Sequence, residues 1–510
     1  MISGFATAQG TKELAGRSTE LAFNPLGRTG LQVSCVGFGC YRVTTGVSTH
    51  TQALLKALQS GVNLIDTSAN YADGGSERLV GQVLGELIDS GSLKRDQVVV
   101  VSKGGYLQGR NWERHRERLG KGKPFQDVVT LKEGLAHCIH PEFLDDQIGR
   151  SLDRLKLQTI DGYLLHNPEY YLAWARDQGH SLETSREEYY RRIEKAFRYL
   201  ETEVARKRIR YYGVSSNTFP SPADDSEFTE LQRILQIAET IDAGHHFKII
   251  QLPFNLLESG AIVEKNQPNG KSALDLAREK EIGVLTNRPL NAITAKRMVR
   301  LAGIEVRYRL EYSMIITRIK DLAQSETRLW RKILPQVDAI PGGVQIRIKQ
   351  QGCFAETLKH HWRSFGSYGQ WREAKDSIFA PRIQGVMNYL EPHAKDNPEL
   401  AEWMSNHDKV LKRAFRAVAS IYAEEAVALE RNILRMVEGA DPDGSLPDRL
   451  SQTAVVALIS TAGISTALVG MRKPSYVSDV LAAAGRSNVK KERALFWQRL
   501  SEKSKGLFAE

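Results

Sequence analysis

The sequence predicts an α/β fold in which eight strands and their helices close into a (β/α)8 barrel of the TIM type, with a helical subdomain inserted into it. Short β-branched or apolar runs alternate with segments of helical periodicity, which is typical of parallel βα units. Eight such runs occur along the 510 residues, and one gap between them is much longer than the rest. A chain of this length can bury a large core and hold a sizeable insertion.

The eight expected strands are short and largely apolar. Strands of a parallel sheet that is covered on both faces read as continuous apolar runs, and VVVVSK shows this property. The strands are expected over residues 33–39, 61–67, 98–103, 160–166, 209–216, 247–254, 282–290 and 464–470.

Amphipathic segments between the strands are expected to form the outer ring of helices, because their apolar residues recur three or four positions apart. THTQALLKALQSG, SERLVGQVLGELI, PEFLDDQIGRSLDRLKL and SALDLAREKE show this spacing. The opening thirty residues, which end in FNPLGRTG, are expected to form a short tail and a turn-linked hairpin.

Two segments exceed what a minimal barrel needs. An arginine-rich stretch at roughly 105–139 follows the third strand and is expected to cover the barrel mouth, because βα loops are usually short. Residues 292–449 separate strands seven and eight and contain several long helical patterns. We therefore expect a barrel over 1–291 and 450–510, with 292–449 as a helical subdomain inserted at its top face.

Composition and charge are ordinary for a globular protein. The chain is 41% apolar and 25% charged, and its net charge of +10 comes from 70 basic and 60 acidic residues. No stretch approaches the roughly 20 apolar residues of a membrane span, and the N-terminus lacks a basic start with an apolar core. We therefore expect a cytoplasmic protein without membrane contact.

The cysteines are few and scattered, so all four are expected to be thiols in a reducing compartment. His137, Cys138 and His140 lie close together, but no second ligand pair at a recognisable spacing accompanies them. They are expected to be ordinary helix-end residues, and no metal is expected. The four cysteines are Cys35, Cys40, Cys138 and Cys353.

Polar side chains end three successive strands, where a barrel enzyme places its chemistry. Strand two ends in Asp66, with Tyr71 five residues further on; strand three ends in Lys103, and strand four in His166. Hydride transfer to a carbonyl builds negative charge on oxygen, so the site must supply a proton donor and nearby positive or dipolar groups. A lysine lowers the pKa of a neighbouring phenol, and a paired aspartate fixes the lysine. Each residue alone has a structural interpretation, but the four types together favour catalysis.

At these residues the sequence resembles the aldo-keto reductase family. The similarity covers most of 24–291 and 450–485 in the family's order and does not include the long insertion. It lies in NPLGRTGLQVSCVGFGCYR, GVNLIDTSANYADGGSERLVGQVL, VVVVSKGG, HPEFLDDQIGRSLDRLKLQTIDGYLLHNPE, IRYYGVSSNTF, QLPFNLLE, VLTNRPL and ALVGMRKPSYVSDVLAA.

The resemblance implies an oxidoreductase that transfers hydride between a nicotinamide cofactor and an aldehyde, ketone or alcohol, with sugar-like compounds among the candidates. It makes Tyr71 the general acid/base, tuned by Lys103 and Asp66, while His166 holds the carbonyl. The identity of the substrate is not implied, because the loops that shape the pocket depart from the family.

The resemblance also implies cofactor-binding residues at the later strand ends. Ser216, Asn217 and Gln251 would bind the nicotinamide carboxamide, and Arg288 the pyrophosphate, with a structural salt bridge as the alternative for Arg288. Asn287 replaces an aromatic residue that stacks on the nicotinamide in many members. The full set is Gly39, Ser216, Asn217, Gln251, Asn287, Arg288, Pro289, Leu290, Gly470, Arg472, Lys473 and Asp479.

NADP(H) is favoured over NAD(H) because Arg472 and Lys473 begin the helix after strand eight, where a phosphate would be attracted. The alternative is a solvated helix start. Asp479 would accept from the adenine amino group, whereas Tyr476 and Val480 depart from residues that many NADP-dependent relatives carry.

Two other functions are consistent with parts of the sequence. The barrel would serve as a regulatory or interaction subunit if it bound cofactor without turnover, although all four catalytic residue types are present. The segments WRKILPQV, KHHWRSF and YGQWREAK would form a nucleic-acid surface, but their arginines alternate with acidic residues as on a solvated helix face. We expect a small-molecule carbonyl or alcohol partner and no nucleic acid; the sequence does not define the oligomeric state.

Overall fold

The computed structural model describes residues 1–294, 297–304, 306–485 and 490–507. The chain divides into two compact units, Met1–Ala295 with Met436–Glu510, and Lys296–Arg435. The domain boundaries expected after residues 291 and 449 stay a prediction. In the described part of the chain, no helix has the length and apolar character that a membrane crossing requires.

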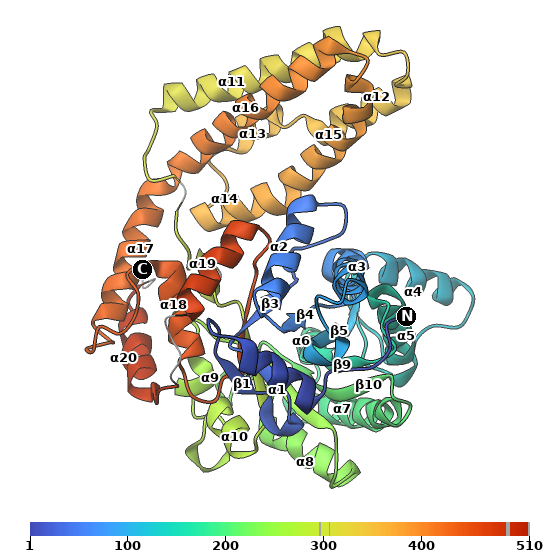
Figure 1. Cartoon of the computed structure of the whole chain (residues 1–510), viewed down its shortest axis with the longest axis vertical. Helices are drawn as coiled ribbons and strands as arrows, with labels where there is room; N and C mark the ends of the chain where they lie inside the picture. Colours follow the sequence, from blue (N-terminus) through green and yellow to red (C-terminus); the bar gives the residue numbers. More distant parts are fainter. Residues whose placement is uncertain (295–296, 305, 486–489, 508–510) are drawn as a thin grey trace. The chain divides into compact units, whose positions relative to one another are not determined.

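The first unit is a closed barrel of eight parallel strands, as predicted (Figure 1). Every strand overlaps its expected range, and every residue of the third barrel strand is buried, as its apolar sequence indicates. In order around the barrel the strands are β3 (Val36–Gly39), β4 (Leu64–Asp66), β5 (Val99–Gly104), β9 (Ile160–His166), β10 (Ile209–Ser215), β11 (Phe247–Pro253), β12 (Gly283–Asn287) and β15 (Thr466–Val469).

A hairpin precedes the barrel, as expected, and is formed by β1 (Phe23–Pro25) and β2 (Gln32–Ser34). Leu26 and Leu31 from this hairpin join the cluster of buried side chains that the barrel strands contribute. The prediction of a short tail before the hairpin is wrong, because a helix, α1 (Ala8–Arg17), forms there and is capped by Thr7.

Helices surround the strands, and the four amphipathic segments are helical as predicted. They bury one face because apolar residues recur three or four positions apart, as at Leu144, Ile148 and Leu152. The helices are α2 (Ser48–Gln59), α3 (Gly75–Asp89), α5 (Pro141–Leu155), α6 (Tyr170–Asp177), α7 (Leu182–Ala205), α8 (Leu231–Ile241), α9 (Gly260–Val263), α10 (Ala273–Glu279), α18 (Leu450–Ile459), α19 (Pro474–Ala484) and α20 (Ala494–Ser504).

The stretch after the third barrel strand is a small folded element rather than an open loop. Three short strands pair in the order β6-β8-β7, and Phe125, Cys138 and Phe143 pack together beside them. His137 ends β8 and not a helix, while the His140 side chain caps α5. The elements are β6 (Tyr106–Leu107), α4 (Arg110–Gly120), β7 (Val129–Lys132) and β8 (Leu135–His137).

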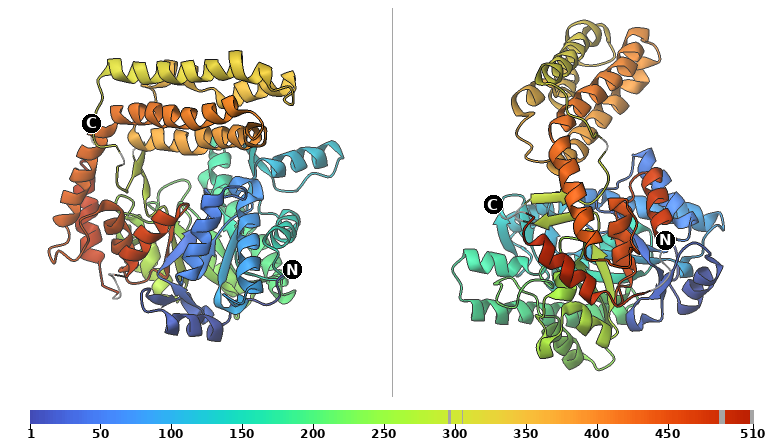
Figure 2. Two further views of the ribbon diagram at one scale, coloured as in Figure 1. Left: turned by 45° about the horizontal axis from the view of Figure 1, so that its top comes forward. Right: turned by 90° about the vertical axis from the view of Figure 1, so that its left-hand side faces the viewer.

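The second unit confirms the predicted helical insertion. Figure 2 shows α11 and α16 running side by side, and Ile315, Ile319 and Leu322 of α11 share an apolar cluster with residues of α16. The elements are β14 (Arg297–Arg300), α11 (Tyr312–Arg328), α12 (Gly342–Gly352), α13 (Ala355–His361), α14 (Tyr368–Ala374), α15 (Ala380–Ala394) and α16 (Pro398–Ile421), after which α17 (Ala423–Glu438) returns the chain to the barrel.

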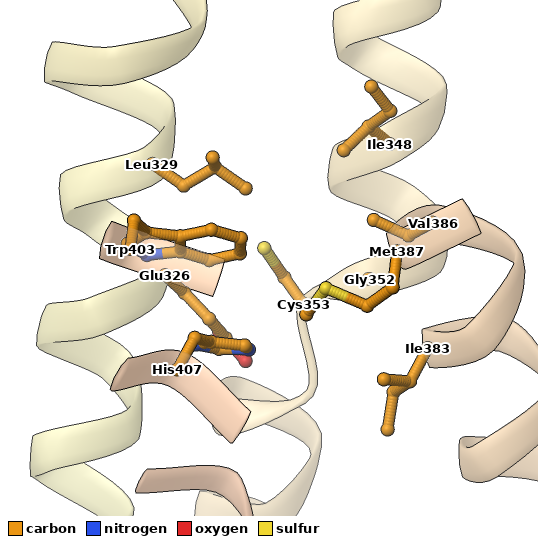
Figure 3. A pocket seen from close by; sticks show the side chains of 10 residues that line it. All are labelled: Glu326, Leu329, Ile348, Gly352, Cys353, Ile383, Val386, Met387, Trp403 and His407. Atoms are coloured by element: carbon orange, nitrogen blue, oxygen red, sulfur yellow. The ribbon is translucent and has the colours of Figure 1, made fainter. Parts of the chain in front are cut away.

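A small cavity inside the second unit lies beside a buried carboxylate (Figure 3). Its volume of about 10 Å³ corresponds to about one water molecule, so it is a packing feature. Glu326 accepts hydrogen bonds from the amides of Phe354, at 2.8 Å, and Ala355, at 3.1 Å, and so caps the first turn of α13. Burial raises the pKa of this carboxyl to about 7.

Candidate active site

Lys103 connects the predicted aspartate and tyrosine at one end of the barrel. Its Nζ lies 2.6 Å from Asp66 Oδ1 and 3.3 Å from the Tyr71 hydroxyl, and it also donates to the Thr67 carbonyl at 3.0 Å. Asp66 ends β4 and Lys103 lies in the neighbouring strand β5, so the parallel pairing brings the two side chains together. Both are buried, and their mutual pairing offsets the cost of removing two charges from water.

The pKa of the Tyr71 phenol lies well above its usual value, first because of burial and second because of the Asp66 carboxylate. The expectation that Lys103 draws this pKa toward neutrality does not hold in this geometry. Burial outweighs the lysine charge, which Asp66 already balances at 2.6 Å. The phenol therefore keeps its proton across the neutral range.

The backbone after Tyr71 is strained and held from a neighbouring segment. Ala72 and Asp73 both adopt left-handed conformations, with φ of 47° and 53°, which cost about 1 kcal/mol or more for a residue with a side chain. The backbone amide of Arg110, at the start of α4, donates to Asp73 Oδ1 at 3.1 Å. The segment after β5 thus helps to fix the loop that carries the tyrosine.

His166, at the end of β9, lies beside the tyrosine with its ring edge-on, 5.9 Å between centroids. Burial lowers the pKa of this imidazole well below its usual value, and the Lys103 charge lowers it further. The ring is therefore neutral at physiological pH. Its Nδ1 lies 3.1 Å from the Ser68 hydroxyl.

Aromatic rings pack around Tyr71 and His166. Tyr41 meets Tyr71 edge-on at 5.2 Å, and Tyr106 meets His166 at 4.8 Å and Tyr170 at 5.3 Å. Tyr106 comes from β6, so the segment after β5 contributes directly to the site. Such a wall suits a small organic substrate, since pockets for small molecules are lined mainly by apolar and aromatic groups.

The residues expected to bind the carboxamide lie together at the ends of β10 and β11. Gln251 donates to Asp66 Oδ1 at 2.8 Å and accepts from Ser215 at 3.0 Å, which links it to the pair of Asp66 and Lys103. The Ser216 hydroxyl contacts Thr218 at 3.1 Å. The Asn217 side-chain oxygen accepts from Arg288 at 3.0 Å. These polar groups are therefore organised mainly by one another.

Arg288 forms the structural salt bridge that was its alternative interpretation. Its guanidinium lies 2.5 Å from Glu258, with Asn217 as a second partner. Next to it, the buried Asn287 Oδ1 has no hydrogen-bond partner among the described residues. The pyrophosphate role of Arg288 stays a prediction. Pro289 and Leu290 follow directly and are buried.

Glu169 is a buried carboxyl that sequence reasoning missed, although it lies only three residues after His166. Its Oε1 accepts from the Asn217 amide at 2.8 Å, while its Oε2 has no partner in the described chain. Burial raises the pKa of this carboxyl to about 7. It stands directly beside the expected carboxamide-binding residues.

Arg472 and Lys473 lie at the start of the helix after strand eight, as the sequence predicts. Asp479 of the same helix is bonded to other side chains of the protein. Lys473 is the N-cap of α19, with Arg472 just before it. Both oxygens of Asp479 are used by the side chains of Arg449, at 2.7 Å, and Ser451, at 3.0 Å. This geometry gives the adenine role of Asp479 no support.

Two glycines, Gly39 and Gly470, complete the set of residues expected to bind the cofactor. Gly39 ends β3, and a side chain there would meet the Val469 carbonyl at 3.4 Å, whereas a side chain at Gly470 would meet nothing within 4 Å. All four cysteines are free thiols, and no group of three or more metal-binding side chains occurs among residues that the structure describes.

Comparison with known proteins identifies the family of the chain. Residues 36–326 match the Aldo/keto reductase family, and this match spans more than half of the chain. The chain therefore belongs to the aldo/keto reductase family.

Similar proteins include several reductases. The chain is 33% identical to the NADH-specific methylglyoxal reductase of Escherichia coli over 150 residues, which is 28% of this chain and 40% of that protein. It is 26% identical to the NAD(P)H-dependent D-xylose reductase of Scheffersomyces stipitis over 140 residues, 28% of this chain and 33% of that protein. The matches thus span less than half of each relative.

Among solved structures, an aldo/keto reductase from Klebsiella pneumoniae in complex with NADP and acetate aligns with 90% of this chain and 88% of its own. The sequence identity is 13% and the TM-score is 0.40.

Proposed function

We propose that the protein is an NAD(P)H-dependent reductase of small carbonyl compounds in which Tyr71 is the general acid. The observation that carries this proposal is the position of Lys103 Nζ, 2.6 Å from Asp66 and 3.3 Å from the Tyr71 hydroxyl, with His166 beside the same phenol. The four residues come from β4, the loop after it, β5 and β9. A binding subunit without turnover would not need this arrangement.

The protein's own groups handle the oxygen and the proton. The cofactor supplies the hydride when it is bound. Tyr71 donates its phenolic proton to the substrate oxygen, and the Lys103 ammonium stabilises the phenolate that remains. Because burial raises the pKa of Tyr71, the phenol is protonated at neutral pH, as a proton donor must be.

The residues at the later strand ends fit a nicotinamide dinucleotide. A carboxamide needs both a hydrogen-bond donor and an acceptor. The unpartnered Asn287 Oδ1 can accept a hydrogen bond from it, and the Gln251 amide keeps hydrogen-bonding capacity beyond its bond to Asp66. Arg472 and Lys473, at the N-terminus of α19, suit the phosphate that distinguishes NADP(H). We therefore favour NADP(H), with NAD(H) as the alternative.

Cofactor titration followed by a substrate panel tests the proposal. NADPH and NADH are titrated into the protein while tryptophan fluorescence is recorded, and the nucleotide that binds is then combined with aldehydes, ketones and sugars. Saturable quenching with carbonyl-dependent oxidation of the nucleotide is expected. Binding without oxidation in the presence of every carbonyl would support the regulatory-subunit alternative.

A further inference from the structure

The peptide group between His166 and Asn167 is held from two sides. Its carbonyl oxygen lies 2.8 Å from Nε2 of His137, and its N–H donates to the Ser215 carbonyl at 2.7 Å. A carbonyl oxygen can only accept, so Nε2 of His137 is the donor of the first bond. The His137 ring is 2% exposed, and burial lowers the pKa of this imidazole to about 4. The ring is therefore neutral at physiological pH, and its single proton lies in the bond to the His166 carbonyl.

His137 belongs to the segment after β5, where it ends β8 and pairs with β6. The close approach of this segment to β9 requires a glycine at position 105. A side chain at Gly105 would lie 2.6 Å from the His166 carbonyl oxygen and 2.7 Å from His137 Nε2. The amide of Cys138 donates to the Gly105 carbonyl at 2.9 Å, which fixes the backbone next to His137. The sequence thus provides both the donor and the space for this bond.

The backbone that follows the peptide group is strained. Asn167 adopts a left-handed conformation with φ of 51°, which residues with side chains disfavour. A flip of the peptide group would take Asn167 out of this conformation, and it would also turn the backbone at His166. The hydrogen bonds to His137 and Ser215 oppose the flip. They therefore help to keep the His166 ring beside Tyr71, at 5.9 Å between centroids.

Tyr106 contacts the same two residues from β6. Its hydroxyl lies 2.7 Å from the side-chain amide of Asn167, and its ring meets the His166 ring edge-on at 4.8 Å. Because a phenol can donate or accept, this contact forms with either orientation of the amide. Tyr106 also meets the His137 ring edge-on at 5.8 Å. The segment after β5 thus contacts His166 at its ring and at its main chain.

We propose that His137 is a positioning residue of the active site, which holds His166 in place for the substrate through the carbonyl of their shared hydrogen bond. It acts through the main chain of His166 and not on the substrate itself. The segment after β5 then supports both sides of the site, because it also fixes the loop of Tyr71 through the bond between Arg110 and Asp73. The effect on turnover rests on the proposed function, whereas the hydrogen bond does not.

Selective labelling detects the hydrogen bond without any substrate. His166–Asn167 is the only histidine–asparagine pair in the sequence, so protein made with carbonyl-carbon-13 histidine and nitrogen-15 asparagine gives one peptide signal. His137→Gln keeps a side-chain N–H that can donate, whereas His137→Met has the same length and no donor. We expect the carbonyl carbon of this signal to move upfield in His137→Met, because it loses its donor, and to stay near its original shift in His137→Gln.

The same variants are compared in turnover. We expect the kcat for an accepted carbonyl to fall about three- to tenfold in His137→Met, the value of about one hydrogen bond, and to be largely retained in His137→Gln. The nucleotide Kd should stay within about twofold in both. His115→Met is the matched control, because it replaces another buried histidine of the same segment, on α4. Its peptide signal and its kcat should equal those of the unmodified protein.

An unchanged peptide signal in His137→Met, an equal change in His115→Met, or an equal kcat in His137→Met and His137→Gln would overturn the inference. If His137→Met does not fold, nitrogen-15 spectra of the histidine rings in the unmodified protein decide, with the His137 signals assigned by their loss in His137→Gln. A protonated Nε2 supports the bond, and an unprotonated Nε2 overturns it. No turnover by the unmodified protein would contradict the proposed function and leave the hydrogen bond established by its signal.

Discussion

Replacing Glu169 by glutamine should change how the stability of the barrel depends on pH. Burial raises the pKa of this carboxyl from 4.5 to about 7 in the folded protein. Between these two pH values the folded protein holds the proton and the unfolded chain has released it, so raising the pH favours unfolding. The stability associated with the protonated carboxyl is fully present below pH 4.5 and is lost as the pH rises through 7.

The size of the effect follows from the shift. A difference of about 2.5 pKa units corresponds to about 3 kcal/mol of unfolding free energy, since one unit is worth about 1.4 kcal/mol. Glu169 is only 2% exposed, so solvent screening reduces this value little. Glutamine has the same shape and can still accept from the Asn217 amide, but it does not ionise.

Urea denaturation at several pH values from 4.5 to 8, for the unmodified protein and Glu169→Gln, measures the effect. The difference in unfolding free energy between the two proteins should shift by about 3 kcal/mol in favour of the variant across this range. Glu326→Gln should produce a similar change only in the transition of the helical unit, where burial raises the pKa of Glu326 to about 7. A pH-independent difference for Glu169→Gln would refute the reasoning.

Three further predictions concern the ion pair, the cofactor and the insertion. Lys103→Met should abolish turnover and lower the unfolding free energy by about 3–5 kcal/mol, because Asp66 is left as an unpaired buried charge. Adding Asp66→Asn to this variant should restore the stability but not the turnover. Restored turnover in the double variant would contradict the catalytic role of the pair. Arg472→Ala combined with Lys473→Ala should raise the Kd for NADPH about tenfold more than that for NADH in fluorescence titrations, whereas equal losses would contradict the NADP(H) preference. Replacing residues 297–435 by a short flexible linker should leave a barrel that unfolds cooperatively, with an altered substrate range or sedimentation coefficient. Unchanged kinetics and an unchanged sedimentation coefficient would exclude a role of the helical insertion in substrate choice and in assembly.

The barrel was predictable because its signals are local. Buried parallel strands must be apolar and their covering helices amphipathic, so both elements leave a pattern in the sequence. Helix α1 leaves none, since AQGTKELAGR contains few apolar residues and two glycines. The strands β6, β7 and β8 are two to four residues long, too short to establish a period.

The sequence predicts the residue types of the candidate site but not the partners that these side chains have in the structure. The ends of β4, β5 and β9 identify Asp66, Lys103 and His166 once the barrel is assumed. The partners of Ser68 depend on distances between side chains of different strands, which the sequence does not contain. The same is true of the pairing of Arg288 with Glu258.

The most direct test of the central claim compares Tyr71→Phe with the unmodified protein. The Kd for the nucleotide and the kcat for a carbonyl accepted by the unmodified protein are measured on the same samples. The substitution removes only the hydroxyl that lies 3.3 Å from Lys103. We predict a nucleotide Kd within about twofold and a kcat lower by about 10²- to 10⁴-fold, the usual contribution of a positioned acid. A kcat that remains within a few-fold of the original would show that Tyr71 is not the general acid.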